Sequence, residues 1–330
     1  MTKTFLSSGD LIVDRRALYA QMLAEAGDFS SAADLMEQAL HDAPDWAAGW
    51  MMAGDFHLRA ATLGAAIAAW ERAAQHDPSG VLGAQMQLAA HGIGNVEAEA
   101  QAAYVEALFD QYAGQFEQAL LQKLDYVVPE LLAALICETM AELGTDGFAR
   151  GLDLGCGTGL MGERLRHLVS HLTGVDISAA MVTETREKGI YDGVERADLA
   201  DFLGEGVHAA DIVTAADVFM YCPALPPIFA LVRTALRPGG LFAFSVERHD
   251  GEEAQWLQAS LRFAHNGDAI ARGLAEAGFE VLRVMTETIR TDRGMPVWGL
   301  LYIARRPHDN DAMEVSDLAI GAELPTLSVN

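Results

Sequence analysis

The sequence predicts two domains, an all-α domain followed by an α/β domain whose sheet is mostly parallel. Residues 14–92 are rich in alanine and leucine, and their pattern repeats with a period of 34 residues. After Gly147, short apolar runs alternate with amphipathic stretches, which is typical of the strands and helices of a doubly wound sheet. The first run leads into GLDLGCGTGL at 151–160, a glycine-rich stretch at the place where such sheets bind ligands.

The helical repeat rests on four positions of AADLMEQALHDAP that recur in AAIAAWERAAQHDP, 34 residues later. The pairs are Ala32 and Ala66, Met36 and Trp70, Ala39 and Ala73, and Pro44 and Pro78. Small alanines let paired helices approach closely, the larger residue fills the groove between them, and proline ends the second helix. The period and the residues resemble tetratricopeptide repeats over about residues 13–92. By analogy, such repeats would serve docking or assembly.

The first repeat departs from this pattern. Trp50 and Gly54 supply the large and small residues expected on the first helix of the second repeat. Arg16 and Ala20 hold the equivalent places in the first repeat. The departure predicts a capped terminal unit.

The predicted domain boundaries lie where these patterns change. They are 1–95 for the repeats, 96–145 for a helical connector, 146–305 for the α/β domain and 306–330 for a polar tail. Near the end of the α/β domain, FEVLRVMTETIR and PVWGLLYIA are separated only by TDRGM, which is too short for a crossover helix. The last two strands are therefore expected to form an antiparallel hairpin.

The composition is that of a folded protein, with 51% hydrophobic residues among 330. Its 22 Lys and Arg against 47 Asp and Glu give a net charge of −25, which repels nucleic acids and anionic membranes. No apolar run approaches the ~20 residues that span a bilayer. Cys137, Cys156 and Cys222 form no CxxC pair, so we expect three small buried side chains and no zinc site. These features predict a soluble, cytoplasmic protein.

The glycine loop contains Gly155, Gly157 and Gly159, which let the chain turn sharply and let its backbone touch a ligand. Three alternatives are open for this loop. It is a tight turn that binds no ligand, it binds a dinucleotide, or it binds S-adenosylmethionine. The dinucleotide fingerprint needs a glycine at position 160, where this sequence has Leu160. Asp153, two residues before the first glycine, would repel a pyrophosphate, whereas S-adenosylmethionine carries a sulfonium and an ammonium group. The loop therefore favours S-adenosylmethionine.

Two further acids follow the next two predicted strands. Asp176 ends the run HLTGVD, where a carboxylate can accept hydrogen bonds from both ribose hydroxyls. Asp198 ends VERAD, where it can accept from an adenine amino group, and Leu199 can flank the ring. Each acid alone would be an ordinary loop residue, but three at successive strand ends predict a nucleoside site.

These residues resemble the class I S-adenosylmethionine-dependent methyltransferases. DLGCGTG, GVDIS, ADLADF and RPGGLFAFS match the motifs of that family in order and spacing over residues 150–304. The resemblance implies a Rossmann-like sheet of seven strands with the last strand antiparallel, and transfer of a methyl group to a small molecule, leaving S-adenosylhomocysteine. The whole chain resembles a bacterial group of methyltransferases that begin with tetratricopeptide repeats.

The resemblance also implies which residues hold the cofactor. The lead-in LFDQYAGQFEQAL is similar to the helix that covers the cofactor in small-molecule members, so that Tyr112 would bind the methionine carboxylate and Phe116 would line the pocket. The full set of implied cofactor residues is Tyr112, Asp153, Gly155, Cys156, Gly157, Gly159, Asp176, Ile177, Met181, Asp198, Leu199 and Ala216.

The acceptor site is expected in two loops. In the family, the loop AADVFMYCPAL contacts cofactor and acceptor, which implicates Asp217, Phe219 and Tyr221. In SLRFAHNGDAI, before a helix that starts near Asp268, Arg262 can clamp a substrate carboxylate and His265 can act as a general base. We therefore expect His265, Asp217 and Tyr221 to be catalytic, and Arg262 and Phe219 to bind substrate.

Weaker candidates remain at the edges of this site. Arg248, His249 and Arg290 are candidates for a cationic rim around the acceptor. His167 and His171 have the i, i+4 spacing of a metal pair, but the second begins a predicted strand, so we expect no metal.

Two rival functions stay open. One is an interaction protein whose second domain is inactive, and the other is a nicotinamide-dependent oxidoreductase, which Leu160 and Asp153 disfavour. The sequence does not determine the methyl acceptor, the accepting atom, the need for a base, the role of the repeats or the oligomeric state.

Overall fold

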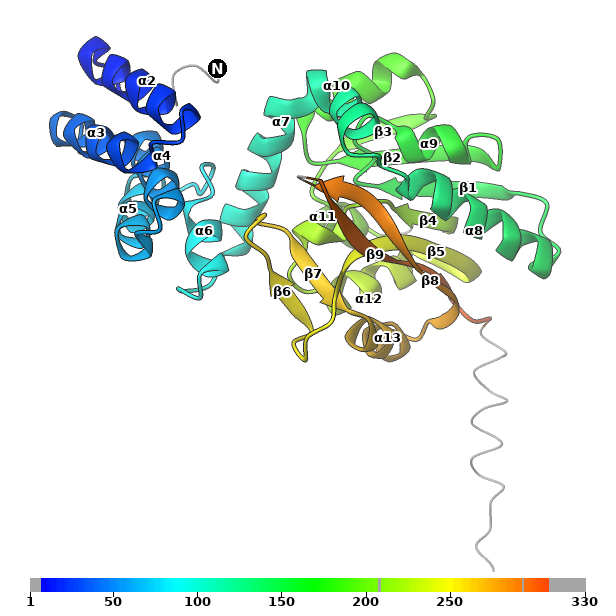
Figure 1. Cartoon of the computed structure of the whole chain (residues 1–330). Coiled ribbons are helices and arrows are strands. Elements are labelled where there is room, and N and C mark those ends of the chain that lie inside the picture. The colour runs from blue at the N-terminus through cyan, green and yellow to red at the C-terminus, as the bar shows by residue number, and fades with distance from the viewer. Residues whose placement is uncertain (1–6, 207–208, 293, 309–330) are drawn as a thin grey trace, which may run out of the picture. The chain divides into compact units, whose positions relative to one another are not determined.

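The computed structural model describes residues 7–206, 209–292 and 294–308, without the side chains of 114–123. The chain forms two compact units (Figure 1). The first comprises Met1–Tyr112 and the short segment Leu257–Arg262, and the second comprises Ala113–Trp256 and Phe263–Asn330.

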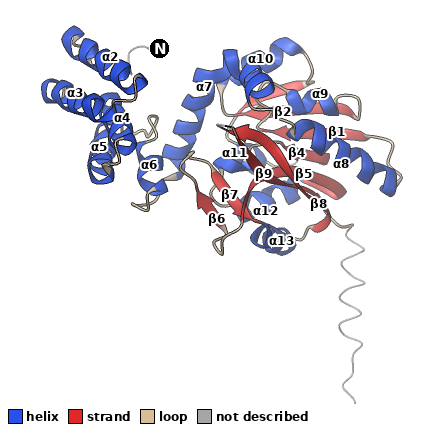
Figure 2. Cartoon of the chain, in the orientation of Figure 1, coloured by secondary structure: helices blue, strands red, loops and turns tan. Residues whose placement is uncertain are grey.

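The first unit is helical, as the sequence predicts (Figure 2). Its helices are α2 (Leu11–Glu25), α3 (Phe29–Asp42), α4 (Ala47–Arg59), α5 (Leu63–His76) and α6 (Ala84–Ala90), and α7 (Ala98–Lys123) begins here. Each of α2 to α5 packs against the next helix in the chain. Asp10 and Asp28 accept hydrogen bonds from the free backbone N–H groups at the starts of α2 and α3.

The repeated positions form the contacts between these helices. Ala32, Met36 and Ala39 on α3, and Ala66, Trp70 and Ala73 on α5, are all 0% exposed. The Trp70 ring lies so close to α4 that a Cβ added to Gly54 would lie 2.3 Å from Trp70 Nε1. The large and small residues of the repeat therefore interlock across helix pairs.

The second unit contains one mixed sheet. Its strands are β1 (Phe148–Leu154), β2 (Val169–Asp176), β3 (Gly193–Arg196), β4 (Ala210–Ala215), β5 (Leu236–His249), β6 (Gln255–Leu257), β7 (Phe263–Asn266), β8 (Glu280–Asp292) and β9 (Met295–Arg305). The order is β3-β2-β1-β4-β5-β7-β6, and β9 pairs with β5 and with β8. β1 to β5 are parallel to one another. The chain order reverses at β1 and β4, which is where doubly wound sheets bind ligands.

The predicted C-terminal hairpin is present. β8 and β9 are antiparallel, from the pair Glu280 and Arg305 to the pair Asp292 and Met295. β9 also runs antiparallel to β5, so it lies between β5 and β8. The sheet has nine strands in the part of the chain described, whereas the resemblance implied seven. The difference is β6 and β7, because residues expected in a loop instead form β7, which pairs with the end of β5, and β6, which lies beside β7.

Helices cover both faces of the sheet. They are α8 (Val128–Leu143), α9 (Leu160–Leu165), α10 (Ala179–Lys188), α11 (Leu199–Gly204), α12 (Pro226–Ala235) and α13 (Gly267–Glu276), with a 3-10 turn at Phe219–Tyr221. Alternate residues of β5 enter two different cores: Phe242 and Phe244 pack with α11, α12 and α13, whereas Leu241 and Ala243 pack with α8 and α9. Because successive side chains of β5 point to opposite faces of the sheet, this strand packs against the helices on both faces.

Two expectations from the sequence concern the burial of the cysteines and membrane-spanning helices. Cys156 is buried and Cys222 is half-buried, but Cys137 on α8 is exposed, so the expectation of three buried cysteines is wrong for Cys137. None of the helices described is both long enough and apolar enough to cross a membrane.

Candidate functional site

The glycine loop joins β1 to α9 and turns in a conformation that favours glycine. Gly155, Gly157 and Gly159 have φ angles of +62°, +52° and +95°. A Cβ on Gly155 would also lie 2.5 Å from Val218 Cγ2, in the loop after β4. The loop therefore depends on glycine both for its backbone and for its contact with the neighbouring strand end.

Asp176 holds this loop from the end of β2. Its carboxylate oxygens accept hydrogen bonds from the backbone N–H of Gly157 at 2.8 Å and of Ser178 at 2.9 Å. The side chain is buried, and it lies at the strand end where the sequence predicted it. Each carboxylate oxygen has more than one lone pair, so a carboxylate at this strand end can accept several hydrogen bonds at once.

Asp153 lies beneath the loop on β1 and is 1% exposed. Tyr191 donates to one carboxylate oxygen at 2.5 Å, and Thr214 donates to the other at 2.6 Å. Burial raises the pKa of Asp153 to about 6, the two hydroxyl donors oppose this shift, and the nearby charge of Asp176 adds to it. The two acids therefore form a buried, negatively charged pair behind the glycines.

Sequence reasoning missed both donors to Asp153. Thr214 is the residue opposite Asp153 in the β1–β4 ladder. A correct prediction of the strand register would therefore have identified it. Tyr191 lies 38 residues away, in the segment between α10 and β3. Its ring packs against the backbone at Gly162 and Gly174, where a Cβ on Gly162 would lie 2.3 Å from the ring. No local pattern pointed to this contact.

Asp198 begins α11. One of its oxygens accepts from the backbone N–H of Ala200 at 2.7 Å and of Asp201 at 3.3 Å. Leu199 is half-buried against the core of the sheet. Asp198 thus lies two residues beyond the end of β3, and it caps the next helix, a role the sequence analysis did not assign.

The other predicted cofactor residues lie in the turns near Asp153, Asp176 and Asp198. Ile177 and Ala216 are half-buried after β2 and β4. Met181 and Cys156 are buried, and the Met181 N–H donates to Ser178 Oγ. Burial, followed by the charges of Asp153 and Asp176, raises the pKa of the Cys156 thiol well above its usual range. Cys156 is therefore a neutral packing residue near neutral pH.

A second charged cluster lies after β4 and β5. The guanidinium of Arg290, on β8, donates to Asp217 at 2.7 Å and also to Glu247. Burial by itself lowers the pKa of Arg290, but the carboxylates of Asp217 and Glu247 outweigh it and raise the pKa above its ordinary value. Arg290 is 3% exposed, so its predicted place on an exposed cationic rim is wrong.

Phe219 and His265 lie close together, but deeper than we expected. The Phe219 ring is 0% exposed and packs edge-on against Phe229, Phe242 and Phe244. The structure therefore places the ring in the core, and only the backbone of Phe219 contacts His265. His265 is 2% exposed on β7, and its Nε2 lies 3.0 Å from the Phe219 carbonyl oxygen. Because a carbonyl only accepts, Nε2 carries the hydrogen; burial lowers the pKa of this histidine.

The remaining predicted residues fall in different places. Tyr221 is half-buried at the end of the 3-10 turn. Tyr112 and Arg262 belong to the first unit, so their proximity to the glycine loop stays a prediction. The side chain of Phe116 lies outside the described residues. Arg248 pairs with Asp250 and His249 with Glu253, both near the surface.

Metal binding was not expected, and the described part of the chain holds no group of three potential metal ligands. His171 lies on β2, near Asp192 at 3.8 Å. His167 precedes this strand.

Tyr126 is a residue of this region that the sequence did not suggest. It is buried in the turn before α8, where Val127 N–H donates to the Ile289 carbonyl and Thr291 N–H donates to that of Leu124. Burial, and then the negative charge of Asp217, raise the pKa of Tyr126 well above its usual range. The Tyr126 hydroxyl is therefore protonated and neutral, and it lies in the electrostatic field of Asp217 and Asp153.

The residues around the glycine loop fit S-adenosylmethionine better than a phosphate ligand. Two buried carboxylates, Asp153 and Asp176, would repel a phosphate and attract a sulfonium or ammonium group. Thr158 in the same loop is 4% exposed, and its hydroxyl has no hydrogen-bond partner in the described structure. A buried hydroxyl of this kind is expected to be satisfied by a bound group or by water.

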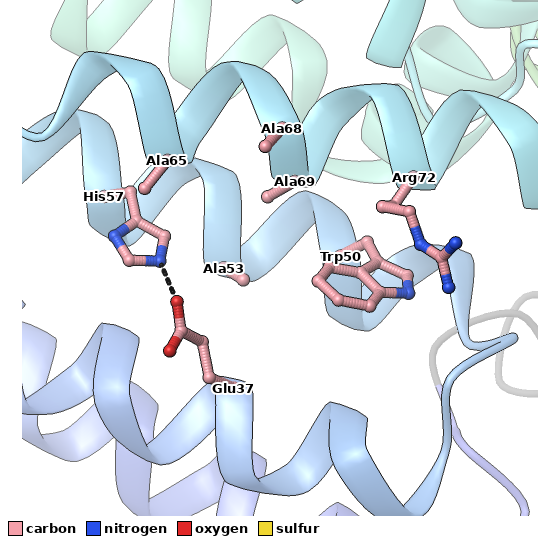
Figure 3. A pocket seen from close by; sticks show the side chains of 8 residues that line it. All are labelled: Glu37, Trp50, Ala53, His57, Ala65, Ala68, Ala69 and Arg72. Atoms are coloured by element: carbon pink, nitrogen blue, oxygen red, sulfur yellow. Dashed lines mark hydrogen bonds and ion pairs between the residues drawn. The ribbon is translucent and has the colours of Figure 1, made fainter.

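The first unit contains a separate groove on α3, α4 and α5 (Figure 3). Its cavity of about 310 Å3 is lined by Glu37, Trp50, Ala53, His57, Ala65, Ala68, Ala69 and Arg72. At one end His57 Nε2 lies 3.0 Å from Glu37, and at the other the Arg72 guanidinium lies 5.4 Å from the centre of the Trp50 ring. Small alanines between these ends leave the groove open.

A doubly wound sheet with a glycine loop and carboxylates near its strand ends is typical of α/β domains that bind nucleosides. Residues 152–244 match a family described as "Methyltransferase domain". The chain is similar to a ubiquinone biosynthesis O-methyltransferase from Marinobacter nauticus, with 27% identity over 107 residues, covering 30% of this chain and 45% of the relative. It is also similar to a malonyl-[acyl-carrier protein] O-methyltransferase from Enterobacter lignolyticus, with 33% identity over 110 residues, covering 32% and 42%. The chain thus spans less than half the length of these curated relatives.

Solved structures resemble the chain over a longer range. An S-adenosylmethionine-dependent methyltransferase from Clostridium acetobutylicum has 17% identity and a TM-score of 0.45, covering 61% of this chain and 99% of that one. A second, from Methanosarcina mazei, has 16% identity and a TM-score of 0.44, covering 52% and 98%.

Proposed function

We propose that this chain transfers the methyl group of S-adenosylmethionine to a small-molecule acceptor. The buried pair of carboxylates behind the glycine loop, Asp153 and Asp176, carries the proposal. It is supported by the match of residues 152–244 to a methyltransferase domain, and by two relatives whose names describe O-methyltransferases.

The cofactor supplies a methyl group on a positively charged sulfur, which is already activated for transfer. Asp176 accepts from the ribose hydroxyls, Asp198 accepts from the adenine amino group, and Tyr112 binds the methionine carboxylate. Asp153 acts through its charge, because both of its oxygens already accept from Tyr191 and Thr214. The residues that surround the cofactor are Gly155, Cys156, Gly157, Gly159, Ile177, Met181, Leu199 and Ala216.

Positioning of the acceptor provides most of the rate enhancement in this proposal, because methyl transfer is an in-line displacement. His265 takes the proton of a hydroxyl acceptor. Its Nε2 is held by the Phe219 carbonyl, which leaves Nδ1 to receive the proton, and its lowered pKa keeps it neutral at pH 7. Arg262 binds an acceptor carboxylate, and Tyr221 orients the acceptor. Asp217 is paired with Arg290, so it positions this loop rather than moving a proton.

Calorimetric titration with S-adenosylhomocysteine tests the cofactor site. We expect binding to the full chain and a loss of tenfold or more in Asp176→Ala, because a buried charged hydrogen-bond acceptor is removed. Asp201→Ala is the matched control, since Asp201 is exposed on the neighbouring helix. Absence of binding to the unmodified protein at millimolar ligand would overturn the proposal.

The rival function is an adaptor whose second unit does not catalyse. The observation behind it is the open groove of the first unit, which favours docking of a partner through tetratricopeptide-type repeats. Incubation of a cell extract with S-adenosylmethionine labelled in the methyl group distinguishes the two. Transfer of label to a small molecule supports the enzyme, and binding of the cofactor without any transfer supports the adaptor.

The working environment follows from charge and cysteine use. A net charge of −25 disfavours nucleic acids and anionic membranes as partners. The three cysteines are free, which suits a reducing compartment such as the cytoplasm.

A further inference from the structure

Helix α2 in the first unit has two faces of opposite character. Val13, Ala17, Ala20 and Ala24 are buried on one face. On the other face Leu11, Ile12, Leu18, Tyr19 and Met22 are 73%, 63%, 59%, 62% and 61% exposed. At 100° per residue, these two sets point in opposite directions from the helix axis. We call the five exposed side chains the α2 stripe.

The α2 stripe is unusual for a terminal helix of a stacked array. Terminal repeats of such arrays normally carry a polar outer face, and the sequence predicted a capped terminal unit here. Instead, α2 buries small residues and exposes large ones, which reverses the usual arrangement. The exposed face of α2 is therefore apolar, and it has the composition of a contact surface.

We infer that the α2 stripe is a self-association surface that pairs with α2 of a second copy of this chain. At roughly 100 Å2 of exposed surface for each large side chain, the five side chains of the stripe offer about 500 Å2 per copy. A pair would bury about 1,000 Å2, which is the area that a specific interface is expected to reach. The largest apolar patch on a typical monomer is about 300–600 Å2, so the stripe lies in the upper part of that range.

The charge at the centre of the stripe determines the orientation of the pair. Leu11, Arg15, Leu18 and Met22 follow the four-three-four spacing of a helix-pairing seam, with Arg15 exposed near its middle. In a parallel pair the two Arg15 residues would face each other and repel. In an antiparallel pair about a two-fold axis, Leu11 lies opposite Met22 of the other copy, and the stem of Arg15 covers the other Leu18. The antiparallel arrangement also opposes the two helix dipoles favourably.

The first test is the mass of the full chain in solution. Light scattering and sedimentation should give twice the 35.4 kDa of one chain. Leu18→Glu combined with Met22→Glu should give one chain, with unchanged helix content by circular dichroism because both positions are exposed. Leu63→Glu should stay a dimer, since Leu63 is an exposed leucine of the same unit outside the stripe. An unmodified protein that is monomeric, or a stripe variant that stays dimeric, would overturn the inference.

The second test checks the register in a Cys137→Ala background, which removes the exposed native thiol. A mixture of the Leu11→Cys and Met22→Cys chains should form a disulfide-linked dimer under mild oxidation, whereas either chain alone should form much less. Equal cross-linking of each chain with itself would overturn the antiparallel register. These tests do not depend on methyl transfer, so failure of the proposed activity and failure of self-association are separate results.

Discussion

In two neighbouring regions of the sheet edge, the acidic side chains accept hydrogen bonds from different kinds of donor. Near the end of β1, Asp153 accepts hydrogen bonds from two hydroxyl groups, those of Tyr191 and Thr214. After β4, Asp217 accepts from the guanidinium of Arg290, which also binds Glu247. Hydroxyl donors stabilise a carboxylate without cancelling its charge, whereas the guanidinium of Arg290 cancels one of the two negative charges of Asp217 and Glu247. The β1 region therefore keeps a negative field for a cationic ligand, and the β4 region is held together by a buried ion pair.

The largest expected effect comes from breaking the β4 cluster. Arg290→Met should lower the free energy of unfolding by about 3–5 kcal/mol, because the buried Glu247 and the half-buried Asp217 lose their cation. Urea unfolding measures this change. The control Arg248→Met removes an exposed ion pair with Asp250 and should change stability by less than about 1 kcal/mol. Equal losses in both variants would contradict the distinction between the regions.

The next effect concerns the pH dependence of the β1 region. The pKa of Asp153 is raised from 3.8 to about 6, so the folded state binds its proton more tightly than the unfolded state does. The resulting stabilisation is complete below pH 4 and is lost as the pH rises through 6, by at most about 3 kcal/mol. Asp153→Asn removes this titration, so its stability relative to the unmodified protein should rise across that range in urea unfolding at several pH values.

Asp192 provides the opposite control. Hydrogen bonding from Arg166 lowers the pKa of Asp192, so its contribution to stability is present above the ordinary pKa and is lost as the pH falls. Asp192→Asn should therefore change the pH profile in the reverse direction. A profile for Asp153→Asn that runs parallel to that of the unmodified protein would show that Asp153 keeps an ordinary pKa.

A smaller effect is expected where the two regions touch. Gly155→Ala should cost about 1–3 kcal/mol of stability, because φ is +62° and the new Cβ would lie 2.5 Å from Val218. Gly189→Ala is a matched control, since its φ is +65° but nothing lies within 4 Å of its Cβ position. The difference in thermal unfolding between these two variants measures the effect of the contact with Val218 alone. Equal unfolding temperatures would show that this contact does not contribute to stability.

The smallest effect separates the two roles of Asp198. Asp198→Ala should cost about 1 kcal/mol by removing the cap of α11, whereas Asp198→Asn should keep the cap. If Asp198 also accepts from adenine, both variants should weaken binding of S-adenosylhomocysteine in calorimetry. Unchanged affinity in Asp198→Asn would leave the residue with its capping role only.

The sequence predicted the main features of the fold because these depend on local patterns. The period of 34 residues placed Met36 and Trp70 in helix contacts, and the short TDRGM segment predicted the β8–β9 hairpin. The strand-end positions of Asp153, Asp176 and Asp198 followed from the apolar runs that precede them. By contrast, β6 and β7 were missed, because β7 pairs with the end of β5 and β6 pairs with β7, and neither strand has a clear pattern of its own.

The sequence by itself determined that a glycine loop follows the first strand and that acids follow the next ones, since both are properties of consecutive residues. Only the tertiary structure decided what surrounds them. It brought Tyr191 and Thr214 to Asp153, moved Arg290 from an expected rim into a buried ion pair, and placed the Phe219 ring in the core. Such contacts join residues that are tens of positions apart, and they are fixed by strand register and packing, which no single stretch of sequence contains.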